Sequence, residues 1–122
     1  RVYPSSGVFP ERMSDGSCWD DWPCGLPDPF VNWTIDSTTR ETGYVDGTTT
    51  PEWGSATYMD VPIYATSTFT YTAWDYDTAT GNEYMLGLDA PVAVAASWLH
   101  DGLVVRHTDD WTSSVIFMFE LR

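Results

Sequence analysis

The chain has 122 residues, of which 43% are hydrophobic and 16% aromatic, which suits one packed domain over residues 1–122 and leaves no room for a second. Its 18 acidic residues face five arginines and no lysine, for a net charge of −13, which argues against nucleic acid and bare anionic membranes as partners. No apolar run approaches the roughly 20 residues that a membrane-spanning helix needs.

Strand patterns recur along the whole chain. Val2–Phe9 is the first, and Pro4 and Gly7 within it predict an edge position. The other expected strands, in chain order, are Phe30–Ile35, Arg40–Val45, Ala56–Tyr64, Thr68–Trp74, Tyr84–Leu88, Leu103–His107 and Ser114–Leu121. Seven or eight short strands separated by turn signals predict an all-β, antiparallel Greek-key β-sandwich with at most one short helix.

One segment, Asp89–Leu99, fits two structures. Asp89 could cap a short helix that has Pro91 in its first turn. The Val-Ala-Val alternation that follows favours a strand instead. We expect a short helix or an irregular turn.

The only two cysteines are Cys18 and Cys24. They cannot complete a four-thiolate zinc site, and the two histidines, His100 and His107, lie far away in the sequence. We expect a local disulfide rather than two free thiols, and with it a secreted or cell-surface location. The chain opens at Arg1 rather than Met, so we also expect a segment whose targeting sequence has been removed.

Acidic residues concentrate in two predicted loops. The first runs from Asp15 to Val31, and the second begins with Asp75 and Asp77 and ends at Glu83. Calcium takes six to eight oxygen ligands, several of them carboxylates, and a divalent cation relieves the repulsion among such groups. A surface adapted to salty media would explain the total charge equally well, but not this clustering. The loops therefore predict a calcium site.

Three short motifs appear in a fixed order. They are Asp28-Pro-Phe-Val31, Thr50-Pro-Glu-Trp53 and the segment Phe69–Asp77, which is followed by Glu83 and Gly87. Together they resemble the C2 domains, calcium-dependent lipid-binding modules first recognised in protein kinase C, which have Asp-Pro-Tyr-Val, Asn-Pro-x-Trp and Asp-x-Asp at the corresponding places. The resemblance runs from about Ser14 to Leu121. Within the family, the chain is similar to a divergent bacterial branch.

The resemblance implies a set of calcium ligands. Asp28 corresponds to the second acid of the first loop, and the acids of the third calcium loop correspond to Asp75, Asp77 and Glu83. The first acid of the first loop is Asp20 or Asp21, because the family's usual position, six residues before Asp28, holds Trp22 here. An insertion pinned by a Cys18–Cys24 bridge would account for this offset.

The resemblance also implies a calcium-binding module that docks on lipid or on a partner protein. The sequence lacks the family's basic lipid-facing patch, and only Trp22 and Leu26 could insert into a membrane. Two alternatives stay open. One is an extracellular structural or adhesive subunit, in which calcium rigidifies or bridges copies, and the other is a carbohydrate-binding module that uses the seven tryptophans and seven tyrosines as stacking platforms.

We expect no enzyme. The chain has no Gly-x-Ser-x-Gly turn, no His-Glu-x-x-His pair and no phosphate-binding glycine loop. His100 and His107 could act as bases, but a histidine beside a strand of a sandwich is more often a surface residue. The function expected is therefore binding, with calcium as the only cofactor.

Overall fold

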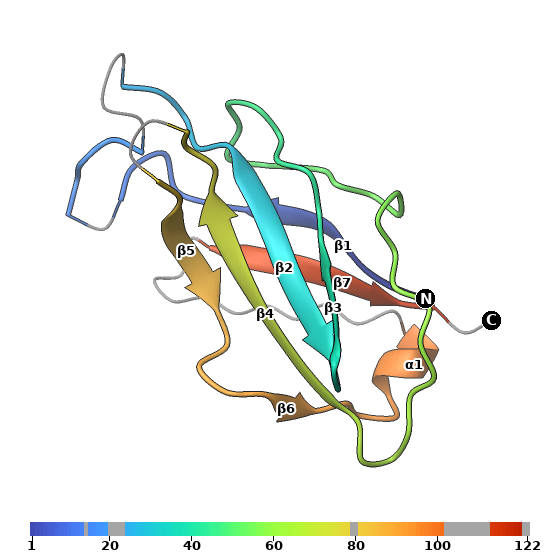
Figure 1. Ribbon diagram of the computed structural model, residues 1–122. Helices are drawn as coiled ribbons and strands as arrows, with labels where there is room; N and C mark the ends of the chain where they lie inside the picture. Colours follow the sequence, from blue (N-terminus) through green and yellow to red (C-terminus); the bar gives the residue numbers. More distant parts are fainter. Residues whose placement is uncertain (14, 20–23, 79–80, 102–112, 121–122) are drawn as a thin grey trace.

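The computed structural model describes residues 1–13, 15–19, 24–78, 81–101 and 113–120. The elements in these residues are β1 (Val2–Val8), β2 (Pro29–Ile35), β3 (Thr38–Glu41), β4 (Thr68–Asp75), β5 (Glu83–Gly87), β6 (Val92–Ala93), α1 (Trp98–Asp101) and β7 (Ser114–Phe119). One sheet pairs β1 with β7, and the other has the order β3-β2-β4-β5, with β6 added to β4. In Figure 1 the larger sheet faces the viewer and the β1–β7 pair lies behind it. The antiparallel β-sandwich with one short helix is confirmed.

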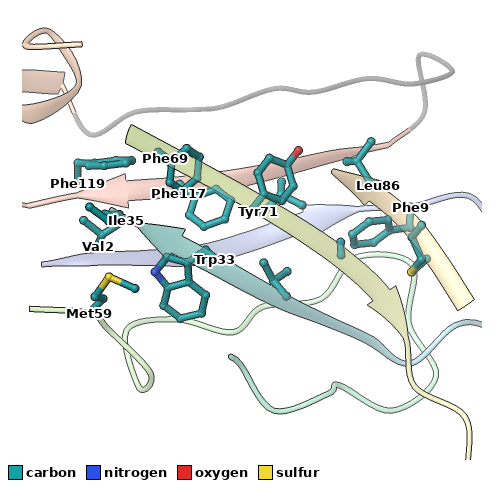
Figure 2. Close-up of a cluster of buried hydrophobic side chains, with 14 of the residues drawn as sticks. Val2, Phe9, Trp33, Ile35, Met59, Phe69, Tyr71, Leu86, Phe117 and Phe119 are labelled. Carbon is teal, nitrogen blue, oxygen red and sulfur yellow. The ribbon is translucent and has the colours of Figure 1, made fainter. Parts of the chain in front are cut away.

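The core lies between the two sheets and is rich in aromatic side chains (Figure 2). Alternate residues of β2, β4 and β7 face inward, as the period of two along a strand requires. The ring of Phe117 on β7 lies 4.9 Å from Phe69, 5.0 Å from Tyr71 and 6.3 Å from Trp33, measured between centroids. Each such pair contributes about 0.5–1.5 kcal/mol beyond the area it buries. Because a one-residue slip would turn these rings to solvent, the core fixes the strand register.

The register between β2 and β4 positions the acidic loops. The two strands pair without a bulge from Pro29 opposite Asp75 to Ile35 opposite Phe69. Since Asp28 directly precedes Pro29, the start of β2 and the end of β4 lie side by side at one end of the sheet. The first loop and the loop after β4 therefore meet there.

Strand β1 matches the predicted first strand, but its free edge is partly covered. Its ladder with β7 shifts register between Pro4 and Ser6, where the proline has no N–H to donate. On the other side its backbone bonds to a loop, through Gly7 N–H to the Pro51 carbonyl at 3.0 Å and Val2 N–H to the Met59 carbonyl at 2.8 Å. A nearby chain segment thus forms hydrogen bonds with the backbone of the edge strand, which Pro4 and Gly7 alone suggested would be exposed.

Two predicted strands between β2 and β4 were placed wrongly. The strand expected at Arg40–Val45 is instead β3, Thr38–Glu41. It ends early because Thr42 takes over the bonding to Val31: its N–H donates to the Val31 carbonyl and its Oγ1 accepts from the Val31 N–H, both at 2.9 Å. The expected strand Ala56–Tyr64 is a turn followed by extended chain, with one isolated bridge from Met59 to Val2.

The segment Asp89–Leu99 is also corrected. The helix begins later than expected, at Trp98, so Asp89 does not cap it. Val92–Ala93 forms the two-residue strand β6, which pairs with the start of β4 and agrees with the alternation seen in the sequence. The expected strand Leu103–His107 lies outside the described residues. Among those described, no helix has the length and apolar character to cross a membrane.

Candidate functional site

Four of the predicted ligands gather at one end of the five-stranded sheet: Asp28, Asp75, Asp77 and Glu83. We call them the acidic pole. The backbone N–H of Asp28 donates to Asp75 Oδ1 over 2.7 Å, although the two residues are 47 positions apart. In return, the N–H of Tyr76 donates to the carbonyl of Asp28 over 3.0 Å. The strand end and the first loop are therefore locked together around these two aspartates.

Asp75 occupies an unusual place for a carboxylate. It continues the inward-facing row of β4, after Phe69, Tyr71 and Ala73, and it is fully buried. Burying a carboxylate is costly unless hydrogen bonds compensate it. Its Oδ1 accepts the hydrogen bond from the Asp28 N–H, which offsets part of that cost. Asp75 thus anchors the acidic pole to the end of the core.

A third chain segment, residues 45–48, bonds to the first loop beside the acidic pole. Gly47 N–H donates to Asp28 Oδ1 over 2.6 Å. Thr48 N–H donates to the Pro27 carbonyl over 2.9 Å, and Val45 N–H donates to the Pro29 carbonyl over 3.1 Å. Gly47 has a φ of 56°, in the left-handed region that favours glycine. The contact of Gly47 with the first loop was not predicted from the sequence.

The loop after β4 returns the chain to the pole. Asp77 N–H donates to Asn82 Oδ1 over 3.0 Å, which closes the loop across its described ends. Glu83 then pairs with Asp75 in the ladder between β4 and β5. Glu83, the last acid of the second predicted loop, therefore lies beside the strand end, and Asn82 is a loop-closing residue that the sequence did not identify.

The first loop carries the predicted disulfide. Cys18 and Cys24 are bonded, with their Cα atoms 5.3 Å apart, so the disulfide is confirmed. Hydrogen bonds from the Oγ and N–H of Ser17 lower the pKa of Asp15 in the same loop. The predicted ligands Asp20 and Asp21 and the possible contact residue Trp22 lie outside the described residues. Leu26, the other possible contact residue, is 40% exposed.

A profile of the C2 domain matches residues 13–100, which is most of the chain. The chain belongs to the C2 domain family. The match confirms the resemblance drawn from the three motifs, although it does not test the predicted bacterial branch. C2 domains are non-catalytic modules that generally bind calcium and lipid.

Solved structures similar to this C2 domain include three of human GIVD cytosolic phospholipase A2. The complex with methyl gamma-linolenyl fluorophosphonate superposes with a TM-score of 0.62 at 17% identity, and a second structure gives 0.60 at 15%. A third, which also contains terbium chloride, gives 0.61 at 16%. Each covers 99% of this chain but only 16% or 17% of the phospholipase. These likenesses establish the fold, and the chain spans about one sixth of the enzyme. None of the curated protein sequences matches the chain.

The donor chemistry of the pole suits calcium better than zinc. Its side chains are carboxylates, the ligands that hard cations prefer, whereas both cysteines are consumed by the disulfide. Within the described ranges, however, no three His, Cys, Asp or Glu side chains are arranged so that they could hold a metal ion. Two of the carboxylates instead accept backbone hydrogen bonds that hold the loops together. The residue types fit calcium, while the side chains seen here do not enclose an ion.

Proposed function

We propose that this C2 domain is a calcium-binding, non-catalytic attachment module of a secreted or cell-surface protein. Its acidic pole binds calcium and thereby docks on anionic groups of lipid or of a partner protein. The observation that carries the proposal is the 2.7 Å bond between Asp28 and Asp75, which brings the acids of two distant loops to one place. The disulfide supports an oxidising, extracellular compartment.

Charge explains why the docking would depend on calcium. At −13 the protein repels an anionic surface, and two calcium ions would reduce the charge only to −9. Attraction must therefore be local, at the pole itself, where the bound cations concentrate positive charge within about 10 Å at ordinary salt. With only five arginines and no lysine in the chain, we expect no basic patch to substitute for calcium. Leu26, which is 40% exposed on the first loop, and Trp22 are the apolar residues that we assign to contact with a docked surface.

Calcium titration by calorimetry tests the metal site. The informative variant is Asp77→Asn, since the hydrogen bond to Asn82 uses the backbone N–H of Asp77 and survives the substitution. The matched control is Asp89→Asn, an exposed aspartate beyond the other end of β5. We expect the first variant to lose at least tenfold in calcium affinity and the second to bind as the wild type does. Equal affinities in all three proteins would exclude the assigned site.

Thermal melts and vesicles test the rest of the proposal. A calcium concentration one hundred times the Kd should stabilise the fold by about 2.7 kcal/mol relative to chelator. Cosedimentation with phosphatidylserine vesicles, with and without calcium, separates lipid docking from protein docking. Calcium binding without vesicle binding would assign the pole to a protein partner. A melt that calcium leaves unchanged would contradict the function proposed here.

A further inference from the structure

Five aromatic side chains form a continuous strip beside the acidic pole: Tyr44, Tyr76, Phe30, Trp74 and Tyr84. We call them the aromatic strip. Tyr44 and Tyr76 are stacked, with centroids 4.2 Å apart and planes 2° from parallel. Phe30 meets Tyr76 edge-on at 6.5 Å, and Trp74 meets Tyr84 edge-on at 5.6 Å. Phe30 and Trp74 are directly opposed on β2 and β4, which joins the two pairs into one strip.

The strip lies on the outer face of the five-stranded sheet. On β4 the residues next to Trp74 in sequence, Ala73 and Asp75, are fully buried and face the core, so Trp74 points outward. Tyr84 extends over Gly87, because a Cβ added there would lie 2.9 Å from the tyrosine hydroxyl. In Figure 1 no described helix or strand crosses this face of β2, β4 and β5.

The two ends of the strip are accessible, whereas Phe30 at its centre is only 7% exposed and packs beneath Tyr76 rather than facing solvent. Tyr44 is 50% exposed and Tyr84 is 47% exposed, at opposite ends of the strip. The indole N–H of Trp74 donates to Thr72 Oγ1 over 2.9 Å, which fixes the orientation of its ring. Tyr76 contacts both Phe30 and Tyr44. Aromatic rings fixed before binding lose little conformational entropy when a ligand docks, which favours affinity.

Beside the strip, this face of β2 and β3 presents hydrogen-bonding side chains, together with the carboxylate of Glu41, which lies opposite Asn32. Thr34 on β2 and Thr39 on β3 share a hydrogen bond of 2.8 Å between their hydroxyls. Asn32, which lies opposite Thr72, stands between Phe30 and these threonines on the same face of β2. Hydroxyl and amide groups both donate and accept, so they suit a ligand that carries many hydroxyls.

We propose that the aromatic strip binds a neutral polysaccharide. One face of a pyranose ring presents C–H groups, which carry slight positive charge and stack on the negative face of an aromatic ring. The hydroxyls at the edge of the sugar then meet the threonine and asparagine row. A nucleic acid, which also stacks on aromatic rings, is repelled by the charge of −13. The same charge also repels acidic peptides and anionic lipid headgroups in the absence of calcium.

This activity goes beyond calcium-dependent attachment and does not require it. The strip adjoins the acidic pole through Tyr76, whose N–H bonds to the carbonyl of Asp28, yet none of its five members is a calcium ligand type. The rings are positioned by packing against one another and by the sheet. Polysaccharide binding should therefore persist in chelator.

Pull-down on microcrystalline cellulose, with affinity electrophoresis in hydroxyethyl cellulose and in neutral xylan, tests the proposal. Each assay is run on the whole chain in calcium and in chelator. The variants are Tyr44→Ala and Tyr84→Ala, which remove the exposed ends of the strip. The control is Tyr64→Ala, because this tyrosine is 63% exposed but lies near the opposite end of the sheet, where it bonds to Ser67. Melting temperatures establish that all three variants are folded.

We expect wild type and Tyr64→Ala to bind at least one of the three glycans, with or without calcium, and each strip variant to lose at least tenfold. No binding of the wild type to any of the three overturns the proposal. An equal loss in Tyr64→Ala, or full binding by both strip variants, also overturns it. Failure of calcium binding with retained glycan binding would refute the proposed attachment function alone.

Discussion

A single methyl group added at Gly87 should weaken the junction between β4 and β5. A Cβ at this position would lie 2.8 Å from the carbonyl oxygen of Tyr71, 2.9 Å from the hydroxyl of Tyr84 and 3.1 Å from Thr72 Cγ2. The tyrosine hydroxyl ends a side chain and can move. The carbonyl of Tyr71 cannot move freely, because it belongs to the backbone of β4 and accepts the N–H of Leu88 over 3.1 Å. Gly87→Ala must therefore separate the two strands.

The cost follows from two opposing effects. Overpacking by one methyl group in a close-packed region costs about 1–3 kcal/mol. Replacing glycine by alanine restricts the unfolded chain and returns about 0.4–1 kcal/mol. We expect a net loss of about 1–2 kcal/mol. With an unfolding entropy of about 2.1 cal/mol/K per residue, 1 kcal/mol corresponds to about 4 °C in this chain, so Tm should fall by about 4–8 °C.

Urea denaturation followed by tryptophan fluorescence measures this loss, and Gly43→Ala is the control. Gly43 is exposed, its φ is not positive, and an added Cβ would have no atom within 4 Å. The control should be unchanged or more stable by up to about 1 kcal/mol. If Gly87→Ala proved as stable as Gly43→Ala, the close approach of the two strands at Gly87 would be refuted.

Three further predictions concern single interactions. Thr42→Val should lower the free energy of unfolding by about 1–3 kcal/mol, because it leaves the buried N–H of Val31 without its acceptor. Thr42→Ser keeps a hydroxyl at this position and should lose less stability. Equal urea midpoints for the two variants would contradict this prediction. Reducing the disulfide should lower the free energy of unfolding by about 2.4 kcal/mol, according to the loop-entropy relation for a closed loop of seven residues. The loss is measured as a shift in the urea midpoint, and an unchanged midpoint would argue against this prediction. The hydrogen bond from Tyr3 to Glu120 lowers the pKa of the Glu120 carboxyl from 4.5 and raises the pKa of the Tyr3 phenol from 10.0. The bond therefore stabilises the fold fully between pH 4.5 and pH 10.0. This stabilisation is lost as pH falls through the lowered pKa of Glu120, and also as pH rises through the raised pKa of Tyr3. The Tm difference between wild type and Tyr3→Phe should follow this profile, and a difference independent of pH would refute it.

Local patterns predicted the strands that form the core. Alternation along residues 30–35 and 68–74 identifies β2 and β4 almost to the residue, because the inward side chains are apolar and most of the outward ones are polar. The spacing of Cys18 and Cys24 was enough to predict their disulfide. The motif at Asp28 and the pair Asp75 and Asp77 likewise pointed to the end of the sheet where the structure brings them.

Where the chain bends back on itself, the sequence was a weaker guide. The strand expected after β2 ends at Glu41 because the side chain of Thr42 replaces a ladder bond, an exchange that β-propensity does not register. Tyr44 and Tyr76 carry no shared motif, yet they stack at 4.2 Å. The contact of Gly47 with Asp28 was missed for the same reason.

The sequence by itself determined which residues face the core and which loops hold the acids, because side-chain alternation is a property of a few neighbouring residues. The tertiary structure alone decided which loops meet. The register of β2 against β4 brings Asp28 to Asp75 across 47 positions, and the same register lays Phe30 against Trp74. That register is set by the packing of buried rings from three strands, Trp33, Phe69 and Phe117, which no single stretch of sequence contains.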